Sequence, residues 1–397
     1  MKSIKDVNFA GKKVIVRVDF NVPLNDQLEV TDDTRIRGAI PTIKKLVDDG
    51  ASVILMSHLG RPKGQVVDSL SLAPVAKELS KLIGQEVLFC KEPLGPEVKA
   101  AADKLQSGQI MLLENLRYYA GETKGDEDLA KQLAELADVY VNDAFGTAHR
   151  RHSSTAVIAE YFPNDKYFGL LMEHEIVNLE IALNTKNAPY TAVIGGAKVS
   201  SKIDIIRNLI PKVDNMIIGG GMSFTFLKAL GGEIGGSLFE EDKLDLAREI
   251  LDEMILNGVN IYLPTDVIAA DKFSNDANTQ TVKSNEIPEG WMGLDIGPES
   301  QKRFAMAVNS SRMILWNGPM GVFEMDKFSN GTKAIAISVA SATTGGAFSA
   351  IGGGDSVAAI NKYELADMLT YVSTGGGAML EYLEGKTLPG IKAILDK

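Results

Sequence analysis

Cysteine is nearly absent from the 397-residue chain, which has only Cys90. One cysteine allows no internal disulfide, and its strand-like setting, EVLFCKEPLG, favours a small buried hydrophobe over a reactive thiol. No apolar run reaches the ~18 residues that a membrane span requires. The N-terminal MKSIKDVNFAGKK also lacks the apolar stretch of a signal peptide. These absences predict a cytoplasmic protein without disulfides or membrane spans.

Several functional signatures are absent as well. The four histidines are scattered, and none is spaced from a cysteine as in a zinc site. The net charge of −11 argues against a nucleic-acid binder. The sequence contains no G-x-x-x-x-G-K-[ST] loop, no H-R-D or D-F-G set, and no G-x-G-x-x-G after the first predicted strand. This counts against P-loop and protein-kinase designs and against a dehydrogenase.

What is present is distributed unevenly. The length exceeds one ordinary core and predicts two domains. Seven of the eleven arginines lie in residues 1–151, whereas 26 of the 38 glycines follow residue 190. The two halves are therefore expected to bind chemically different ligands.

Short apolar runs alternate with helical patterns in both halves. KVIVRVDF, SVILMSH, QIMLLENLR and DVYVNDAF indicate strands in the first half, and YTAVIGG, NMIIGGG, NIYLP, RMILWNG and FSAIGGGD indicate strands in the second. Such alternation predicts an α/β fold with two Rossmann-like domains, each a parallel sheet covered by helices. We expect domains at 1–169 and 187–383, a connecting helix at 170–186, a cleft between the domains, and a segment 384–397 that returns to the first domain.

The stretch VIVRVDFNVPL raises the question of why a buried strand carries an arginine and an aspartate, since an unpaired buried charge is costly. Ligands of open parallel sheets bind beyond the carboxyl ends of the strands. In the first half, polar residues recur at these ends: Asp19, Asn21, His58, Arg61, Arg117, His149 and Arg150, with Arg35 heading the first helix. Arginine forks suit phosphate and carboxylate oxygens. We predict a site for a small polyanion, with surface salt bridges as the alternative.

In the second half, glycine clusters follow the predicted strands. They occur in VIGGAKVSSK, IIGGGMS, AIGGGDS and VSTGGGA, the first of which also supplies Lys198 and Lys202. Glycine admits close backbone approach, and helix N-termini offer N–H groups to phosphate. Asp355 beside the third cluster is consistent with Mg²⁺ between carboxylate and phosphate, and Glu324 suits a ribose hydroxyl. A nucleotide site is predicted; C-caps and tight turns are the alternative for any single cluster.

The sequence resembles the phosphoglycerate kinase family over essentially the whole chain. The stretches that match the family's sequence blocks, in the same order, are RVDFNVPL, SHLGRPKG, LLENLRYYAGE, NDAFGTAHRRHSS, VIGGAKVSSK, WNGPMGVFE, IGGGDS and VSTGGGA. The resemblance implies a monomeric glycolytic enzyme that transfers phosphoryl between 1,3-bisphosphoglycerate and ADP by hinge closure of its domains. Small-molecule substrates are expected, and no nucleic acid or membrane partner. A non-catalytic two-domain anion binder is the rival; it does not account for Asp355 beside GGG or for the two lysines.

The resemblance also implies individual roles. The 3-phosphoglycerate site would comprise Asp19, Asn21, Arg35, His58, Arg61, Arg117 and Arg150, whereas Arg151 stands where the family varies and is left out. The nucleotide site would comprise Lys202, Gly219, Gly220, Gly293, Asn317, Glu324, Gly352, Gly353, Gly354, Asp355 and Thr374. Arg35, Lys198 and Lys202 would be catalytic, and Asp355 would be the protein ligand of Mg²⁺. His58 is expected to orient the substrate as a hydrogen-bond donor, because a carboxylate acceptor needs no base.

Overall fold

The computed structural model describes residues 1–185 and 187–396. The chain divides into two compact units: unit 1 comprises Met1–Val177 and the segment from Thr387 onward, and unit 2 comprises Asn178–Lys386. The division falls within helix α5 (Leu170–Asn184). Lys186, the last residue of the predicted connecting helix, and Lys397 lie outside the described residues.

Unit 1 contains a six-stranded parallel sheet in the order β3-β4-β2-β1-β5-β6. Its strands are β1 (Lys13–Val18), β2 (Ser52–Met56), β3 (Val87–Phe89), β4 (Ile110–Leu112), β5 (Val139–Asp143) and β6 (Lys166–Phe168). The four strands predicted from apolar runs are present, and Cys90 directly follows β3. The short edge strand β6 had no apolar run to signal it.

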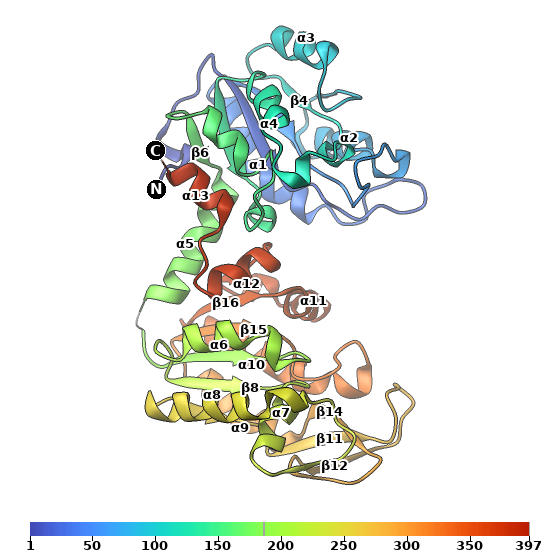
Figure 1. Ribbon diagram of the computed structural model, residues 1–397, viewed down its shortest axis with the longest axis vertical. Helices are drawn as coiled ribbons and strands as arrows, with labels where there is room; N and C mark the ends of the chain where they lie inside the picture. Colours follow the sequence, from blue (N-terminus) through green and yellow to red (C-terminus); the bar gives the residue numbers. More distant parts are fainter. Residues whose placement is uncertain (186, 397) are drawn as a thin grey trace. The chain divides into compact units, whose positions relative to one another are not determined.

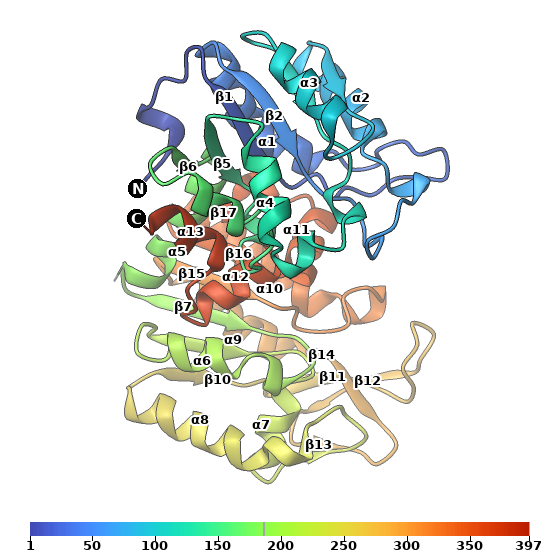
Figure 2. The same ribbon diagram turned by 45° about the horizontal axis from the view of Figure 1, so that its top comes forward.

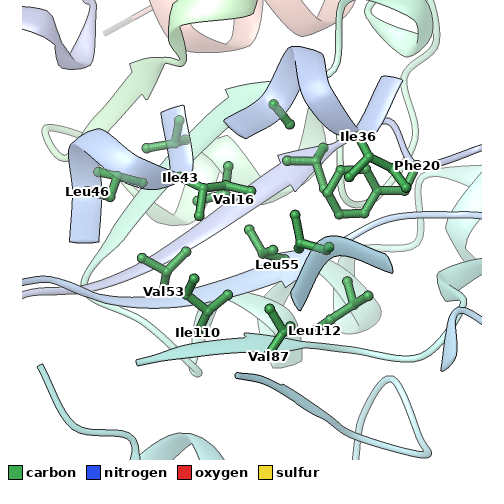
Figure 3. Packing of buried hydrophobic residues seen from close by; sticks show 14 of the residues in the cluster. Val16, Phe20, Ile36, Ile43, Leu46, Val53, Leu55, Val87, Ile110 and Leu112 are labelled. Carbon is green, nitrogen blue, oxygen red and sulfur yellow. The ribbon is translucent and has the colours of Figure 1, made fainter. Parts of the chain in front are cut away.

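The helices of unit 1 enclose its apolar core (Figure 1). They are α1 (Thr34–Asp48), α2 (Ala73–Ile83), α3 (Pro96–Lys104), α4 (Glu127–Ala134) and α13 (Pro389–Leu395). Helix α2 ends at Gly84, whose φ of 75° is the left-handed cap conformation predicted by the glycine. In Figure 3, Ile43 and Leu46 of α1 lie on the side of Val16 and Val53 of the sheet, and Ile36 lies beside Phe20. Burial of these helical and strand faces holds the strand ends in fixed positions.

Unit 2 repeats the plan with a parallel sheet in the order β10-β8-β7-β15-β16-β17. Its strands are β7 (Tyr190–Ile194), β8 (Asn215–Ile218), β10 (Asn260–Tyr262), β15 (Met313–Asn317), β16 (Phe348–Gly352) and β17 (Tyr371–Val372). Its helices are α6 (Ile203–Leu209), α7 (Ser223–Ala229), α8 (Leu244–Leu256), α9 (Pro298–Asn309), α10 (Asn330–Thr344), α11 (Gly354–Lys362) and α12 (Gly377–Leu383). Two parallel sheets covered by helices confirm the predicted α/β class.

Unit 2 also contains two small sheets that the sequence patterns did not indicate. An antiparallel sheet pairs β12 (Thr279–Lys283), β11 (Asp266–Ala270) and β14 (Met292–Ile296), and a parallel pair joins β9 (Glu233–Ile234) to β13 (Glu286–Ile287). The antiparallel strands lie beside α7 (Figure 2), and Val267 and Ala269 share a buried cluster with Phe224. This sheet adds an apolar wall beside the parallel sheet.

The strand registers bring the carboxyl ends of the central strands together. Arg17 on β1 is opposite Met56 and Asn142, and Asn317 on β15 is opposite Ile194 and Gly352. In each sheet the chain leaves these neighbouring strands at the same edge, as expected for parallel pairing. Within the described part of the chain, no helix combines the length and apolarity needed to cross a membrane.

Candidate functional sites at the strand ends

The arginine in VIVRVDF is fully buried, and hydrogen bonds account for its charge. Arg17 donates from Nε to Ser154 Oγ (2.8 Å) and from NH2 to His58 Nδ1 (3.0 Å). Ser154 in turn donates its hydroxyl to buried Glu122 (2.6 Å). The guanidinium therefore reaches a carboxylate through one hydroxyl and orients a histidine at the neighbouring strand end. Asp19, by contrast, lies just past the strand, where 12% of its side chain is exposed.

His58 is held as a neutral donor. Burial lowers its pKa well below the ordinary value, and the guanidiniums of Arg17, Arg117 and Arg35 lower it further. Because arginine only donates, Nδ1 must accept from Arg17, so the proton of the neutral ring resides on Nε2. A neutral imidazole with a fixed Nε2–H agrees with the donor role expected for this residue.

The remaining predicted residues of unit 1 gather around Asp19. Arg35 NH1 lies 3.4 Å from Asp19 Oδ2 and donates to the Asn21 carbonyl (2.8 Å). Asn21 Oδ1 accepts from the Gly60 amide (2.8 Å), and Arg117 NH1 donates to the Gly60 carbonyl (2.8 Å). Three loops that follow different strands are thus connected by direct hydrogen bonds.

Charge effects on pKa values indicate that the other arginines lie near the same cluster. Burial lowers the pKa of Arg117, with Arg17 and then Arg61 contributing as like charges. Burial lowers the pKa of His152 to about 4, and Arg17, Arg117 and Arg150 lower it further. Arg61 and Arg150 are exposed, so their guanidiniums are accessible to a ligand. Direct contacts therefore bring together Asp19, Asn21, Arg35, His58 and Arg117, and charge interactions indicate that Arg61 and Arg150 lie near them.

Sequence reasoning missed the buried residues that support this cluster. Arg17, Glu122, His152 and Ser154 were not assigned to the site. The block NDAFGTAHRRHSS already contains His152 and Ser154, and the charge in VIVRVDF pointed to Arg17. Glu122 gave no local signal, because its partner Ser154 is 32 residues away.

A cavity of about 500 Å³ lies at the strand ends of unit 2. Four of the predicted residues line it: Gly220, Gly293, Glu324 and Asp355. Gly293 has space only for hydrogen, because a Cβ there would overlap the ring of Phe224. The cavity joins loops after β7, β8 and β15 to the antiparallel sheet, so residues distant in sequence share one wall.

Lys202 and Asn317 lie next to one another. Lys202 Nζ donates to Asn317 Oδ1, and Asn317 Nδ2 donates to the Gly352 carbonyl (2.8 Å). Burial lowers the pKa of Lys202, whereas the carboxylates of Asp355 and Glu384 oppose that shift. Gly353 has a φ of 90°, and a Cβ there would lie 2.7 Å from Asn317 Nδ2. Glycine is therefore required both by the backbone and by the close amide.

The other predicted residues of unit 2 lie at the edges of this region. Asp355 is exposed in the first turn of α11, directly after Gly354, and Lys198 is exposed after β7. Thr374 is exposed between β17 and α12, and Gly219 is buried against Met320. Neither Thr374 nor Gly219 lines the cavity. Among the described residues, no group of three or more His, Cys, Asp or Glu could hold a metal.

The apolar part of the cavity was not anticipated from the sequence. It is formed by Phe224, Leu238, Val267, Phe273, Met292 and Leu294. Most of these residues belong to or flank the antiparallel sheet, whose short strands gave no pattern. An apolar slot beside glycine-rich, partly charged strand ends suits a flat base joined to phosphates.

Two parallel-sheet units, one with an arginine cluster and one with this cavity, define a two-domain α/β protein with sites suited to a small polyanion and a nucleotide. The family model for phosphoglycerate kinase matches residues 4–386. A curated phosphoglycerate kinase from Porphyromonas gingivalis is 53% identical over 416 aligned positions, which cover 99% of each chain. The chain belongs to the phosphoglycerate kinase family and is a kinase of glycolysis.

Solved structures agree with this assignment. The phosphoglycerate kinase of Coxiella burnetii has a TM-score of 0.90 at 41% identity, covering 99% of this chain and 98% of its own. The Pyrococcus horikoshii enzyme has a TM-score of 0.83 at 32% identity, covering 100% of this chain and 98% of its own. The family and fold predicted from the sequence blocks are confirmed.

Proposed function

We propose that the chain transfers phosphoryl reversibly between 1,3-bisphosphoglycerate and ADP, yielding 3-phosphoglycerate and ATP. The observation that carries this proposal is the arginine cluster around Asp19, which suits a small polyanion, in a chain whose other unit has a nucleotide-sized cavity. A phosphoryl-transfer enzyme needs positioning and charge neutralisation more than covalent chemistry.

In the proposed substrate site, Arg35, Arg61, Arg117 and Arg150 bind the phosphate and carboxylate oxygens of 3-phosphoglycerate. Asp19 and Asn21 orient the hydroxyl, and His58 donates from Nε2. The Arg35 fork is supported by its bond to the Asn21 carbonyl, which leaves further N–H groups for a ligand. Arg35 is also the proposed catalytic arginine, which stabilises charge on the transferring group.

In the proposed nucleotide site, the apolar slot takes the base beside Gly293 and Glu324 takes a ribose hydroxyl. Gly219, Gly220, Gly352, Gly353 and Gly354, with Thr374, bring backbone close to the phosphates. Asn317 positions Lys202, and Lys198 and Lys202 neutralise charge on the moving phosphoryl.

The donor set near α11 fits Mg²⁺. This ion commonly binds through one or two protein carboxylates, substrate phosphates and waters, so the single carboxylate Asp355 suffices at the first turn of α11. When bound there, Mg²⁺ would neutralise phosphate charge. The lysines and the helix N-terminus supply the remaining positive potential.

The direct test is coupled ATP formation from 1,3-bisphosphoglycerate and ADP. We expect turnover that requires Mg²⁺ and is inhibited by 3-phosphoglycerate as product. Ligand binding without ATP formation would contradict the proposed reaction.

We further propose a cytoplasmic monomer with no nucleic-acid or membrane partner. Its proposed domains are 1–169 and 187–383, joined by the 170–186 helix, with 384–397 returning to the first. The two proposed sites belong to different units, so catalysis requires the domains to close over both substrates.

A further inference from the structure

A second basic cavity exists in unit 1, separate from the arginine cluster. It has a volume of about 540 Å³ and is bounded by η6 (Val157–Tyr161), β6 and α13. In both views, α13 lies beside β6 near the ends of the chain (Figures 1 and 2). The charged residues that line it are Arg151, Glu160, Lys166, Lys392 and Asp396.

Lys166 is the unusual member of this set. The residue is only 4% exposed, and it sits on edge strand β6 opposite Tyr140. Within the described residues, its ammonium forms no hydrogen bond or ion pair within 4 Å. Burial lowers the pKa of Lys166, and Lys2 lowers it further, whereas Asp396 and Glu160 act in the opposite direction. A covered lysine without a close partner costs stability unless an anion compensates it.

The neighbouring charges leave a positive excess. Arg151 is paired with Glu160 at 3.1 Å, so that pair is internally neutral. Among the described residues of the lining, this leaves Lys166, Lys392 and Asp396. Lys2 lies outside the lining but nearby, because its carbonyl accepts from the Phe168 amide (2.7 Å). In the described part of the lining, two ammonium groups therefore face one further carboxylate, and a positive concave surface attracts small anions.

The sequence block that contains Arg151 agrees with a second site. In NDAFGTAHRRHSS, Arg150 belongs to the cluster around His152, whereas the next residue, Arg151, lines the Lys166 cavity. Adjacent arginines thus lie on two separate surfaces. We propose that the Lys166 cavity binds a small multivalent oxyanion of the phosphate type, outside the proposed substrate and nucleotide sites.

Pyrophosphate is the probe. Its binding is measured in the dead-end complex with 3-phosphoglycerate and ADP, in which the two proposed sites are occupied and the cavity remains open. Titration calorimetry is performed at low salt with saturating 3-phosphoglycerate and ADP, which fill the other two sites without turnover. Mg²⁺ is omitted so that it does not sequester the probe. We expect one further equivalent of pyrophosphate to bind the wild-type protein.

Three variants test whether the additional pyrophosphate binds in the cavity. Lys166→Met and Lys392→Met should each weaken it about tenfold or more, because each removes a charged donor. Lys104→Met is the matched control: it removes an exposed lysine of α3, outside the cavity lining, and should bind as wild type. Without pyrophosphate, Lys166→Met should be at least as stable as wild type, because it removes an uncompensated ammonium but keeps the buried stem.

Two results would overturn the proposal: no additional equivalent in the dead-end complex, or equal weakening in all three variants, which would mean diffuse surface attraction. If Lys166→Met does not fold, Lys392→Met decides, because Lys392 lies on α13 and contributes to the cavity from another element.

Discussion

At the residue scale, one buried arginine links strand β1 to the residues of the arginine cluster. Arg17 occupies a core position on β1, yet each hydrogen bond that it makes beyond its own strand reaches a loop bordering the arginine cluster. It fixes the tautomer of His58 and carries positive charge toward His152. Burial of charge therefore shapes the protonation states of the site without Arg17 being exposed to a ligand.

One consequence is a pH dependence of stability that arises from His152. Its pKa is about 4 in the folded protein against about 6.5 when unfolded, so the unfolded state binds more protons below pH 6.5. Stability from this residue is complete above pH 6.5 and is lost as pH falls toward 4. Relative to His152→Gln, wild type should lose up to about 2 kcal/mol more between pH 7 and pH 5.

Urea unfolding at both pH values, followed by circular dichroism, measures this difference. The comparison must be between proteins, because burial raises the pKa of Asp143 and Asp295 to about 7, which acts in the opposite direction. Identical losses in the two proteins would show that His152 does not titrate in this way.

Arg35→Lys tests the proposed catalytic arginine. Lysine keeps the charge but loses the planar fork, so ground-state binding should largely persist while kcat falls roughly 10²–10³-fold. Steady-state kinetics with both substrates measure this. Arg37→Lys, two residues along the same helix and paired with Asp33, is the matched control and should retain activity. A normal kcat for Arg35→Lys would show that Arg35 only forms an ion pair and is not catalytic.

Asp355→Asn tests the proposed metal ligand. The neutral amide is a weaker ligand for a hard cation, so more Mg²⁺ should be needed for half-maximal activity. Titration of Mg²⁺ at fixed ADP gives the comparison. Overlapping activation curves for variant and wild type would remove Asp355 from the proposed metal site.

At the element scale, Asp295 joins three walls of the unit 2 cavity. It lies on β14, its Oδ2 accepts from the Gly331 amide at the start of α10 (2.7 Å), and its Oδ1 accepts from Ile296 (2.9 Å). The same carboxylate packs against Gly321, and the next residue, Val322, donates to the Leu294 carbonyl (2.9 Å). One buried side chain thus aligns the antiparallel sheet with a helix and a loop.

We predict that Asp295→Asn raises the KM for ADP about five- to tenfold, since one backbone hydrogen bond is lost. The KM for 3-phosphoglycerate should not change. Measurement at pH 8 keeps the wild-type carboxylate ionised, because burial raises its pKa to about 7.

Asp266→Asn provides the control. Asp266 also accepts backbone N–H groups at a helix start, from Glu299 and Ser300 of α9, but it does not line the cavity. Its substitution should lower stability and leave the KM for ADP unchanged. Equal changes in KM for both variants would mean that general loosening, rather than alignment of the cavity, is responsible.

At the scale of the whole molecule, the two proposed sites belong to different units, and transfer requires reacting atoms within about 3–3.5 Å. Each substrate alone contacts mainly its own unit and has little preference for a closed form, and a ligand shifts an equilibrium only by such a preference. Solution X-ray scattering should therefore show a clearly smaller radius of gyration with 3-phosphoglycerate and a nucleotide together. Full compaction with nucleotide alone, or none with both, would contradict this account.

The sequence by itself determined the fold class and which polar residues follow the strands. Apolar runs separated by helical patterns predicted the parallel sheets, and because parallel strands end at one edge, Asp19, His58 and Arg117 could be grouped without coordinates. The family blocks located Lys202 and Asp355 in the same way. These features are local in the chain, so local patterns carry them.

Only the tertiary structure decided how the sites are supported. The bond between Ser154 and Glu122, the tautomer of His58, and the apolar wall around Phe224 depend on contacts between segments far apart in sequence. The antiparallel strands that build this wall are short and only partly apolar. No strand-like hydrophobic pattern in the sequence therefore predicted them. The buried charge of Arg17 is likewise compensated in part by a hydrogen bond to Ser154, a residue more than a hundred positions away. A buried charge must be compensated by nearby polar groups, and only the fold decides which groups are near.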